Sequence, residues 1–219
     1  MTAAVSVDIW ADINCPFCYL GKRRFDDALT GFAHRDAVTV THRSFELDPS
    51  LPAGHSEPVI DWIAGKYGIS PDQAAANERD IASQAEAVGL QYQVTGRDYG
   101  SSFDMHRLVH LAALSGMADA VLDALFVANF AQPQPLFGDR ARLVAVVTAA
   151  GLAEADVRRV LDSDDFADAV RADEQQAATF GAGGVPFFVF NNKYALSGAQ
   201  PPEMFTQALE QCWADASSD

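Results

Sequence analysis

The feature that most constrains this chain is a pair of cysteines near its start. The tetrapeptide Cys-Pro-Phe-Cys at residues 15–18 directly follows a strand-like run at residues 5–11 and precedes a helical pattern. A thiol at the first turn of a helix feels the partial positive charge of unpaired backbone N–H groups, and this charge stabilises the thiolate. Two cysteines about one helical turn apart can also bond to each other with little backbone movement. The motif therefore predicts a redox-active dithiol.

The residues around the motif predict a strand, a helix and a second strand. Residues 5–11 alternate apolar and polar side chains, and residues 38–45 alternate again. The segment between them carries an apolar stripe at the helical spacing i, i+3, i+4, i+7: Phe25, Ala28, Leu29 and Phe32. Cys18 lies on this stripe, so we expect it to face inward more than Cys15. A strand-helix-strand unit of this kind is suited to a parallel strand pair.

From about residue 56 the pattern becomes helical for more than a hundred residues. Ser70 and Gln73 form a capping box with a proline at the first helical position, which marks a helix start. Other helices are expected at about residues 60–67, 103–115, 118–130, 139–150 and, in one or two pieces, 154–180. The end of the chain predicts a hairpin of residues 185–190 and 194–197, with a turn at residues 191–192, and then a helix at residues 202–214. The order of these strands and helices predicts an α/β fold, in which an all-helical insertion interrupts a small sheet.

Composition excludes several classes of protein. The chain has 219 residues, of which 49% are hydrophobic, and this is enough for a packed core. Its formal charge of −15 repels phosphate backbones, so we expect no nucleic-acid partner. The sequence has no signal-peptide pattern and no run of about 20 apolar residues, so we expect a cytoplasmic protein without a membrane partner. Three cysteines argue against a disulfide framework.

Three segments together resemble a known family. They are Cys-Pro-Phe-Cys-Tyr-Leu-Gly at residues 15–21, Phe-Asp-Met-His-Arg-Leu at residues 103–108, and the stretch from Gly184 to Gln200 with its Val-Pro entry into a strand. The chain resembles the DsbA family of thiol:disulfide oxidoreductases, and within it the FrnE-like subgroup. This resemblance implies a thioredoxin-like α/β fold with a large all-helical insertion. Residues 1–52 and 181–219 would form the thioredoxin-like domain, and residues 53–180 the inserted helical domain, whose last helix leads back to the sheet.

The resemblance also implies roles for individual residues. Cys15 would be the attacking thiol and Cys18 the resolving thiol, while Pro186 would be a cis-proline packed against the dithiol. Relatives that are glutathione-dependent usually have serine where Cys15 stands, so the presence of both cysteines favours redox chemistry. The residues expected to contact substrate are Pro16, Phe17, Val185, Pro186 and His106. The expected substrates are protein or small-molecule disulfides and thiols, with glutathione among the candidates, and no cofactor is needed beyond the dithiol.

Other interpretations remain open. A glutathione-dependent isomerase or transferase of the same fold is one alternative, and a non-enzymatic peptide-binding or chaperone module is another. The chain contains four residues of the types that bind zinc, namely Cys15, Cys18, His106 and His110. However, 88 residues separate Cys18 from His106, so we expect no metal site. His106 is alternatively a polar residue near the domain junction. Asp12, three residues before Cys15, is interpreted as a surface or turn carboxylate, and an influence on proton transfer at the dithiol is the alternative.

Overall fold

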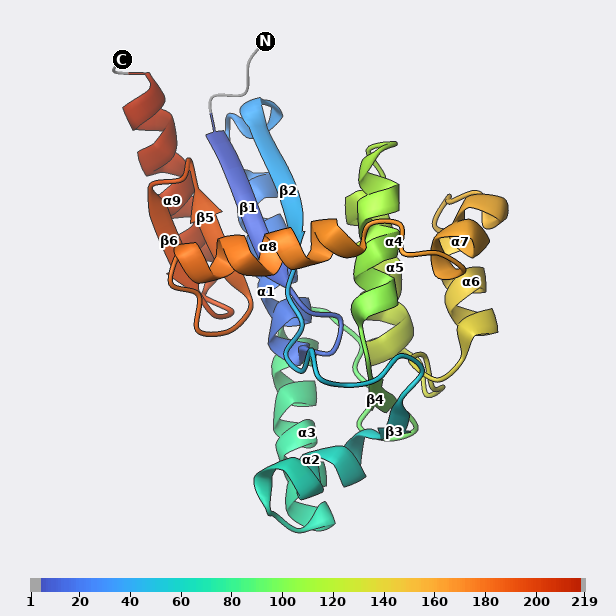
Figure 1. The fold of residues 1–219 in the computed structure, drawn as a ribbon. Coiled ribbons are helices and arrows are strands. Elements are labelled where there is room, and N and C mark those ends of the chain that lie inside the picture. The colour runs from blue at the N-terminus through green and yellow to red at the C-terminus, as the bar shows by residue number, and fades with distance from the viewer. Residues whose placement is uncertain (1–4, 218–219) are drawn as a thin grey trace. The chain divides into compact units, whose positions relative to one another are not determined.

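The computed structural model describes residues 5–217. The chain forms two compact units, one of Met1–Phe45 with Asp173–Asp219 and the other of Glu46–Ala172 (Figure 1). Compactness does not test whether a unit folds alone, so the domain boundaries expected at residues 52 and 181 stay a prediction. No helix in the described part of the chain is long and apolar enough to cross a membrane.

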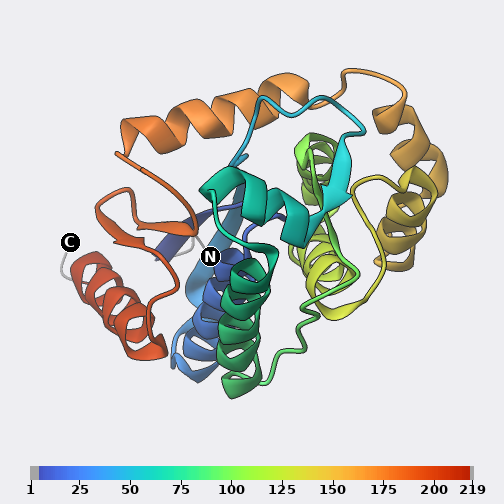
Figure 2. The ribbon, with the colours of Figure 1, turned by 90° about the horizontal axis from the view of Figure 1, so that it is seen from below.

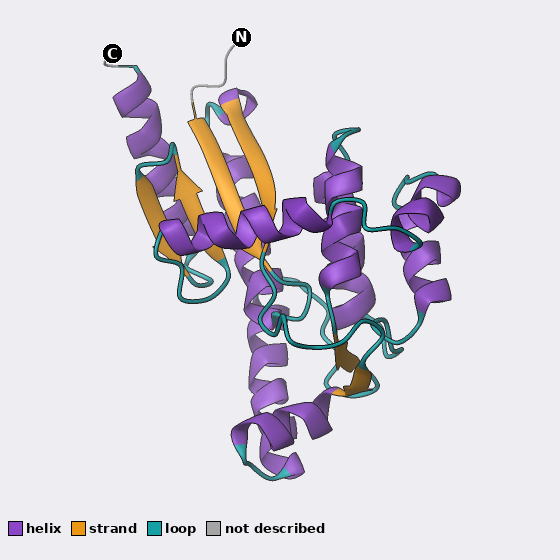
Figure 3. Cartoon of the chain, in the orientation of Figure 1, coloured by secondary structure: helices purple, strands orange, loops and turns teal. Residues whose placement is uncertain are grey.

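The first unit is built on a four-stranded sheet with the order β2-β1-β5-β6 (Figure 3). Its strands are β1 (Val5–Ala11), β2 (Val38–Ser44), β5 (Phe187–Phe190) and β6 (Tyr194–Ser197). Strands β1 and β2 are parallel, whereas β5 pairs antiparallel with both β1 and β6. The parallel pair and the hairpin predicted from the sequence are therefore confirmed.

Helices cover both faces of this sheet because its strands alternate their side chains between two apolar clusters. Val5, Val7 and Ile9 point to one face, where α1 (Pro16–Gly31) and α9 (Pro202–Ala216) pack against them. Trp10 and Phe187 point to the other face, where they pack with Ala177 of α8 (Ala167–Thr179). The C-terminal part of α8 runs across this face of the sheet (Figure 2).

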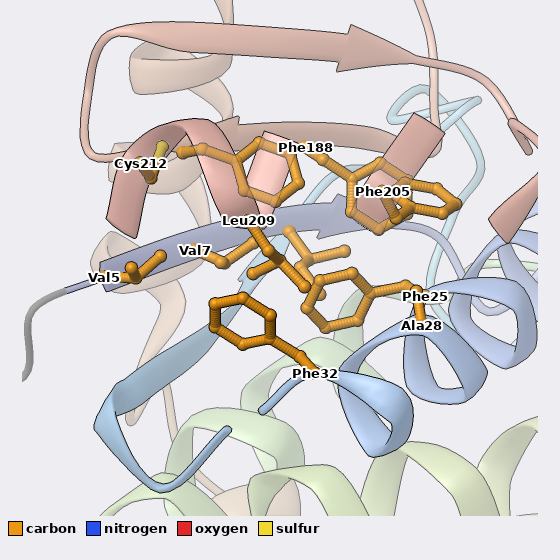
Figure 4. Packing of buried hydrophobic residues seen from close by; sticks show 11 residues of the cluster. Val5, Val7, Phe25, Ala28, Phe32, Phe188, Phe205, Leu209 and Cys212 are labelled. Carbon is orange, nitrogen blue, oxygen red and sulfur yellow. The ribbon is translucent and has the colours of Figure 1, made fainter. Parts of the chain in front are cut away.

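The cluster beneath α1 and α9 contains the predicted helical stripe. Phe25, Ala28 and Phe32 are buried in it together with Phe188 and Phe205 (Figure 4). Cys212 belongs to the same cluster and is fully buried, so this third cysteine is a packing residue of the core. Deleting a large aromatic side chain from such a site costs about 3–5 kcal/mol.

The hairpin turn explains how β5 and β6 are connected. Asn191 and Asn192 have φ angles of 49° and 53°, the left-handed conformation that asparagine tolerates best after glycine. The Asn191 side chain also accepts a hydrogen bond of 2.7 Å from the backbone N–H of Ser6, which ties the turn to the start of β1.

The second unit is mainly helical. It contains α2 (Val59–Tyr67), α3 (Pro71–Ala87), α4 (Phe103–Ala113), α5 (Ala118–Phe126), α6 (Arg140–Ala149), α7 (Glu154–Leu161) and the start of α8. The predicted cap of α3 is confirmed, because Ser70 Oγ accepts a hydrogen bond of 3.2 Å from the N–H of Gln73. Gly68 ends α2 with a φ of 65°.

Two details of this unit differ from the sequence prediction. A two-stranded antiparallel sheet of β3 (Ser56–Pro58) and β4 (Asp98–Gly100) interrupts the helices, and strands of three residues are too short to show an alternating pattern. The helix expected to end at residue 130 changes after Phe126 into a π-helical turn, η2 (Val127–Ala131). The segment 154–180 agrees with the prediction of one or two helical pieces, because it forms two helices that are separated where Phe166 takes a φ of 65°.

Candidate active site at the start of helix α1

Cys15 occupies the N-cap of α1, in a short connection from the end of β1. Its backbone N–H donates to Asp12 O at 3.0 Å, and its carbonyl accepts from the N–H of Cys18 at 3.0 Å. Pro16 is the first residue of the helix, where a backbone N–H has no partner within the helix. The missing N–H of proline therefore costs no hydrogen bond. No side chain caps this helix end, so the partial positive charge of the helix start acts on the Cys15 position.

Both cysteines of the motif are unbonded thiols in a buried environment. The exposed fraction is 4% for Cys15 and 1% for Cys18, so Cys15 is only slightly more exposed than Cys18. The two side chains form a hydrogen bond with each other. The backbone N–H of Asp12 also donates to Cys18 Sγ at 3.4 Å. The structure thus places the two sulfur atoms together, as disulfide exchange within the motif requires.

The surroundings of Cys18 keep its sulfur protonated. Burial is the main reason why the pKa of the Cys18 thiol is raised well above its usual value. The hydrogen bond and the charge of Cys15 raise this pKa further, whereas the N–H of Asp12 acts in the opposite direction. Cys18 is therefore a buried, protonated thiol that becomes a nucleophile only when its proton is removed.

The Val185-Pro186 peptide bond is cis, which confirms the geometry that the family resemblance implied. The Cys15 thiol donates to Val185 O at 3.5 Å, so this segment lies directly beside the N-cap of α1. On its other side, Pro186 O accepts a hydrogen bond of 2.8 Å from the N–H of Gly198. The segment is held between the dithiol and the loop that follows β6.

The two residues between the cysteines form the outer rim of the site. Phe17 is 44% exposed although it is a large apolar side chain, and Pro16 is partly buried. Neither side chain carries a charge or a hydrogen-bond donor. The surface next to Cys15 is therefore apolar, and an exposed aromatic ring of this kind is typical of a binding surface.

His106, the remaining residue expected to contact substrate, lies in α4 of the second unit, where it is buried. Its contact with substrate stays a prediction. Among residues 5–217, no three His, Cys, Asp or Glu side chains lie close enough together to hold a metal ion.

Two further residues belong to the site. Asp12 is fully buried, so its interpretation as a surface carboxylate is wrong, whereas its place in a turn is confirmed because its carboxylate accepts a hydrogen bond from the N–H of Asn14. The charge of Asp12 raises the pKa of Cys18. Gly21 packs against Pro186, and the signal that could have identified it is a glycine in the middle of a helix, where glycine is unfavourable.

Comparisons with known proteins extend over nearly the whole chain. A model of the DSBA-like thioredoxin domain family matches residues 6–210. The crystal structure of a probable DsbA oxidoreductase from Streptomyces coelicolor is 51% identical with a TM-score of 0.92, covering 96% of this chain and 91% of that one. Two more distant proteins also match. The uncharacterized protein YwbO of Bacillus subtilis (strain 168) is 26% identical over 211 residues, covering 94% of this chain and 96% of its own.

A third relative shares the fold at low identity. The structure of a 2-hydroxychromene-2-carboxylate isomerase is 17% identical with a TM-score of 0.70, covering 98% of this chain and 99% of that one. At this identity the likeness concerns the fold alone. The family match and the Streptomyces structure confirm the expected α/β thioredoxin-like fold with a helical insertion between its strands.

Proposed function

The chain belongs to the DSBA-like thioredoxin domain family, and on this premise we propose that it is a thiol:disulfide oxidoreductase working through Cys15 and Cys18. One observation carries the proposal. The Cys15 sulfur lies at the N-cap of α1, within reach of both Cys18 and the Val185 carbonyl. A thiol placed in this way can attack a substrate disulfide, and the second thiol beside it can release the substrate.

The reaction proceeds by two exchanges. The Cys15 thiolate attacks one sulfur of a substrate disulfide, an S–S bond forms between them, and the other substrate sulfur leaves as a thiolate and takes up a proton. Cys18 then loses its proton to solvent and attacks Cys15 Sγ, which closes the Cys15-Cys18 disulfide and releases the first substrate sulfur as a thiol. The substrate gains two electrons and the protein dithiol loses them, and the reverse sequence oxidises a substrate. The protein dithiol supplies both electrons and the protein disulfide can take two back, so the proposed reaction uses no further cofactor.

The proposed substrates are protein or small-molecule disulfides and thiols, with glutathione as one candidate. Phe17 offers an apolar surface beside Cys15 for the residues that flank a substrate cysteine. Val185 precedes β5, where its backbone is suited to strand-like hydrogen bonds with an extended substrate chain. We assign the protein to the FrnE-like subgroup on its three sequence segments and propose a cytoplasmic location.

An insulin disulfide reduction assay tests the activity. We expect the wild type to accelerate reduction, and Cys15→Ser to lower the rate at least a hundredfold because a hydroxyl cannot form the mixed disulfide. Cys212→Ala is the matched control, since Cys212 lies in the core and its loss removes a thiol from outside the site. In Cys18→Ala, a covalent adduct on Cys15 should accumulate, and mass spectrometry after trapping in a cell extract identifies the substrate.

Two outcomes contradict this proposal. Full activity of Cys15→Ser on an electrophile with glutathione would assign the chain to glutathione-dependent transferases or isomerases. Binding of peptides by the wild type without any disulfide exchange would assign it to non-enzymatic binding modules.

A further inference from the structure

Gly21 occupies a position in α1 that a glycine does not favour. It lies six residues after Cys15, in the interior of the helix, where glycine destabilises the helix relative to alanine. Its φ angle is outside the left-handed region, so the backbone at this position is open to any residue. Conformation therefore does not explain the glycine, and space is the remaining reason.

The space beside Gly21 is filled by Pro186. A Cβ added at position 21 would lie 2.8 Å from Pro186 Cγ and 3.4 Å from Ala199 Cα. A separation below 3.0 Å forces one partner to move, and Cγ belongs to a closed ring that cannot rotate away as a flexible side chain does. Gly31, at the end of the same helix, has nothing within 4 Å of the corresponding position.

Pro186 is also held from its other side. Its carbonyl accepts from the N–H of Gly198 at 2.8 Å, and Arg24, one turn after Gly21 in α1, donates to Ala199 O. Val185, the residue before Pro186, accepts the hydrogen bond from Cys15 Sγ at 3.5 Å. The distance between α1 and the Pro186 ring therefore controls where the Val185 carbonyl lies relative to the Cys15 thiol.

We propose that Gly21 is a positioning residue of the dithiol site, which lets the Pro186 ring lie against α1 and so keeps the Val185 carbonyl at the Cys15 sulfur. The proposal rests on the oxidoreductase function proposed above. A carbonyl oxygen accepts a hydrogen bond from the thiol but repels the thiolate, and it also covers the sulfur. Displacing the Val185 carbonyl should make Cys15 more reactive toward small electrophiles. It should also disrupt the surface that aligns a peptide disulfide.

Gly21→Ala, compared with Gly31→Ala, tests the proposal. For Gly21→Ala we expect Cys15 alkylation by iodoacetamide at pH 7 to be at least threefold faster than in the wild type. We also expect the dithiol equilibrium with glutathione to shift at least threefold and kcat/KM for a peptide disulfide to fall at least fivefold. Gly31→Ala should stay within twofold of the wild type in all three. A purely structural loss would change neither the equilibrium constant nor the alkylation rate in folded protein.

A second background isolates the contact itself. Pro186→Ala removes the Cγ atom, so adding Gly21→Ala to it should change the alkylation rate less than twofold, which makes the two substitutions non-additive. If Gly21→Ala does not fold, restoration of folding by Pro186→Ala supports the contact, and failure to restore it overturns the proposal. Wild-type values in folded Gly21→Ala also overturn it. A wild type that shows no exchange with glutathione contradicts the proposed function instead, and the alkylation comparison still tests Gly21.

Discussion

The three cysteines differ in chemistry because each meets a different environment. Cys15 lies at a helix N-cap beside a carbonyl oxygen, and Cys18 lies one turn further into the same helix. Burial raises the pKa of Cys18, and burial also raises the pKa of Cys212 in the core between α9 and the sheet. Residue type alone therefore does not select the nucleophile, and the helix position of Cys15 does.

The raised pKa of Cys18 predicts how the second exchange depends on pH. Only the thiolate attacks, and below its pKa the thiolate fraction of a thiol grows tenfold per pH unit. Burial is the main cause of the shift and persists once Cys15 is in a mixed disulfide. We expect release of a substrate from the Cys15 mixed disulfide to accelerate about tenfold per unit between about pH 7 and pH 9.

Rapid-quench measurement of that release tests the prediction, with Cys18→Ala as the control in which the step is absent. A rate that is already constant at and above pH 7.5 would mean that Cys18 is ionised near neutrality. That result would contradict the protonated state derived from its burial.

The two residues between the cysteines allow a prediction of the reduction potential of the dithiol. Neither Phe17 nor Pro16 can donate a hydrogen bond to the Cys15 thiolate, so the reduced form gains only what the helix start provides. We expect a reduction potential between the roughly −270 mV of thioredoxin and the roughly −120 mV of DsbA, whose reduced form is stabilised. Phe17→His should raise the potential, because an imidazole can donate to the thiolate.

Equilibration in graded glutathione buffers, with thiol labelling as the readout, measures this potential. Phe17→Leu is the matched control, since it keeps an apolar side chain at the exposed position. An unchanged potential in Phe17→His, or a wild-type value near −120 mV, would show that the two residues between the cysteines are not the main control.

At the scale of elements, a polar network joins α8 to the first sheet. Asp173 of α8 accepts hydrogen bonds from the N–H of Ser44 at 2.9 Å and from Arg43 at 3.2 Å. Arg43 also donates to Asp8 of β1 at 2.8 Å, and Trp10 Nε1 donates to Asp173 O at 2.8 Å. Burial lowers the pKa of the Arg43 guanidinium, but the carboxylates of Asp8 and Asp173 outweigh it, and the pKa is raised.

Asp173→Ala should destabilise the protein by about 2–3 kcal/mol, because it leaves a buried N–H without an acceptor and removes one carboxylate from Arg43. Urea unfolding measures the change. Gln175→Ala is the control, since Gln175 is exposed on the same helix and should change stability by about 0.5 kcal/mol or less. Equal effects of the two substitutions would mean that the network does not stabilise the attachment of α8.

The elements that the sequence predicted well are those with a long, regular pattern. Strand β1 and helix α1 combine a period with a clear boundary, and residues 191–192 specify their own turn. Strands β3 and β4 have three residues each and pair at long sequence separation, with Ser56 opposite Gly100 and Pro58 opposite Asp98, so no local sequence pattern predicts them. The π-helical turn after Phe126 differs from an α-helix in its hydrogen-bond pattern, which the apolar spacing of the sequence does not report.

At the scale of the whole molecule, the sequence likewise predicted only part of the candidate site. The cysteines and Pro186 could be predicted because a short motif and a family resemblance mark them. The contact of Gly21 with Pro186 depends on two segments more than 160 residues apart coming together, and the burial of Asp12 is likewise a property of the folded chain. Spacing in sequence therefore identified the reacting atoms, whereas the groups that position them required the structure.

The net charge of −15 predicts how the whole molecule selects among small disulfides. An acidic protein repels an anionic disulfide such as oxidised glutathione and attracts a cationic one such as cystamine, and salt screens both effects. Between about 10 mM and about 150 mM salt the Debye length shortens from about 30 Å to about 8 Å. We expect the second-order rate constant to rise several-fold for glutathione disulfide over this range and to fall for cystamine. The neutral hydroxyethyl disulfide serves as the control and should change little. Stopped-flow kinetics of the reduced protein measure all three. A rate constant that falls with salt for glutathione disulfide and rises for cystamine would show that positive charges close to Cys15, rather than the net charge, control the encounter.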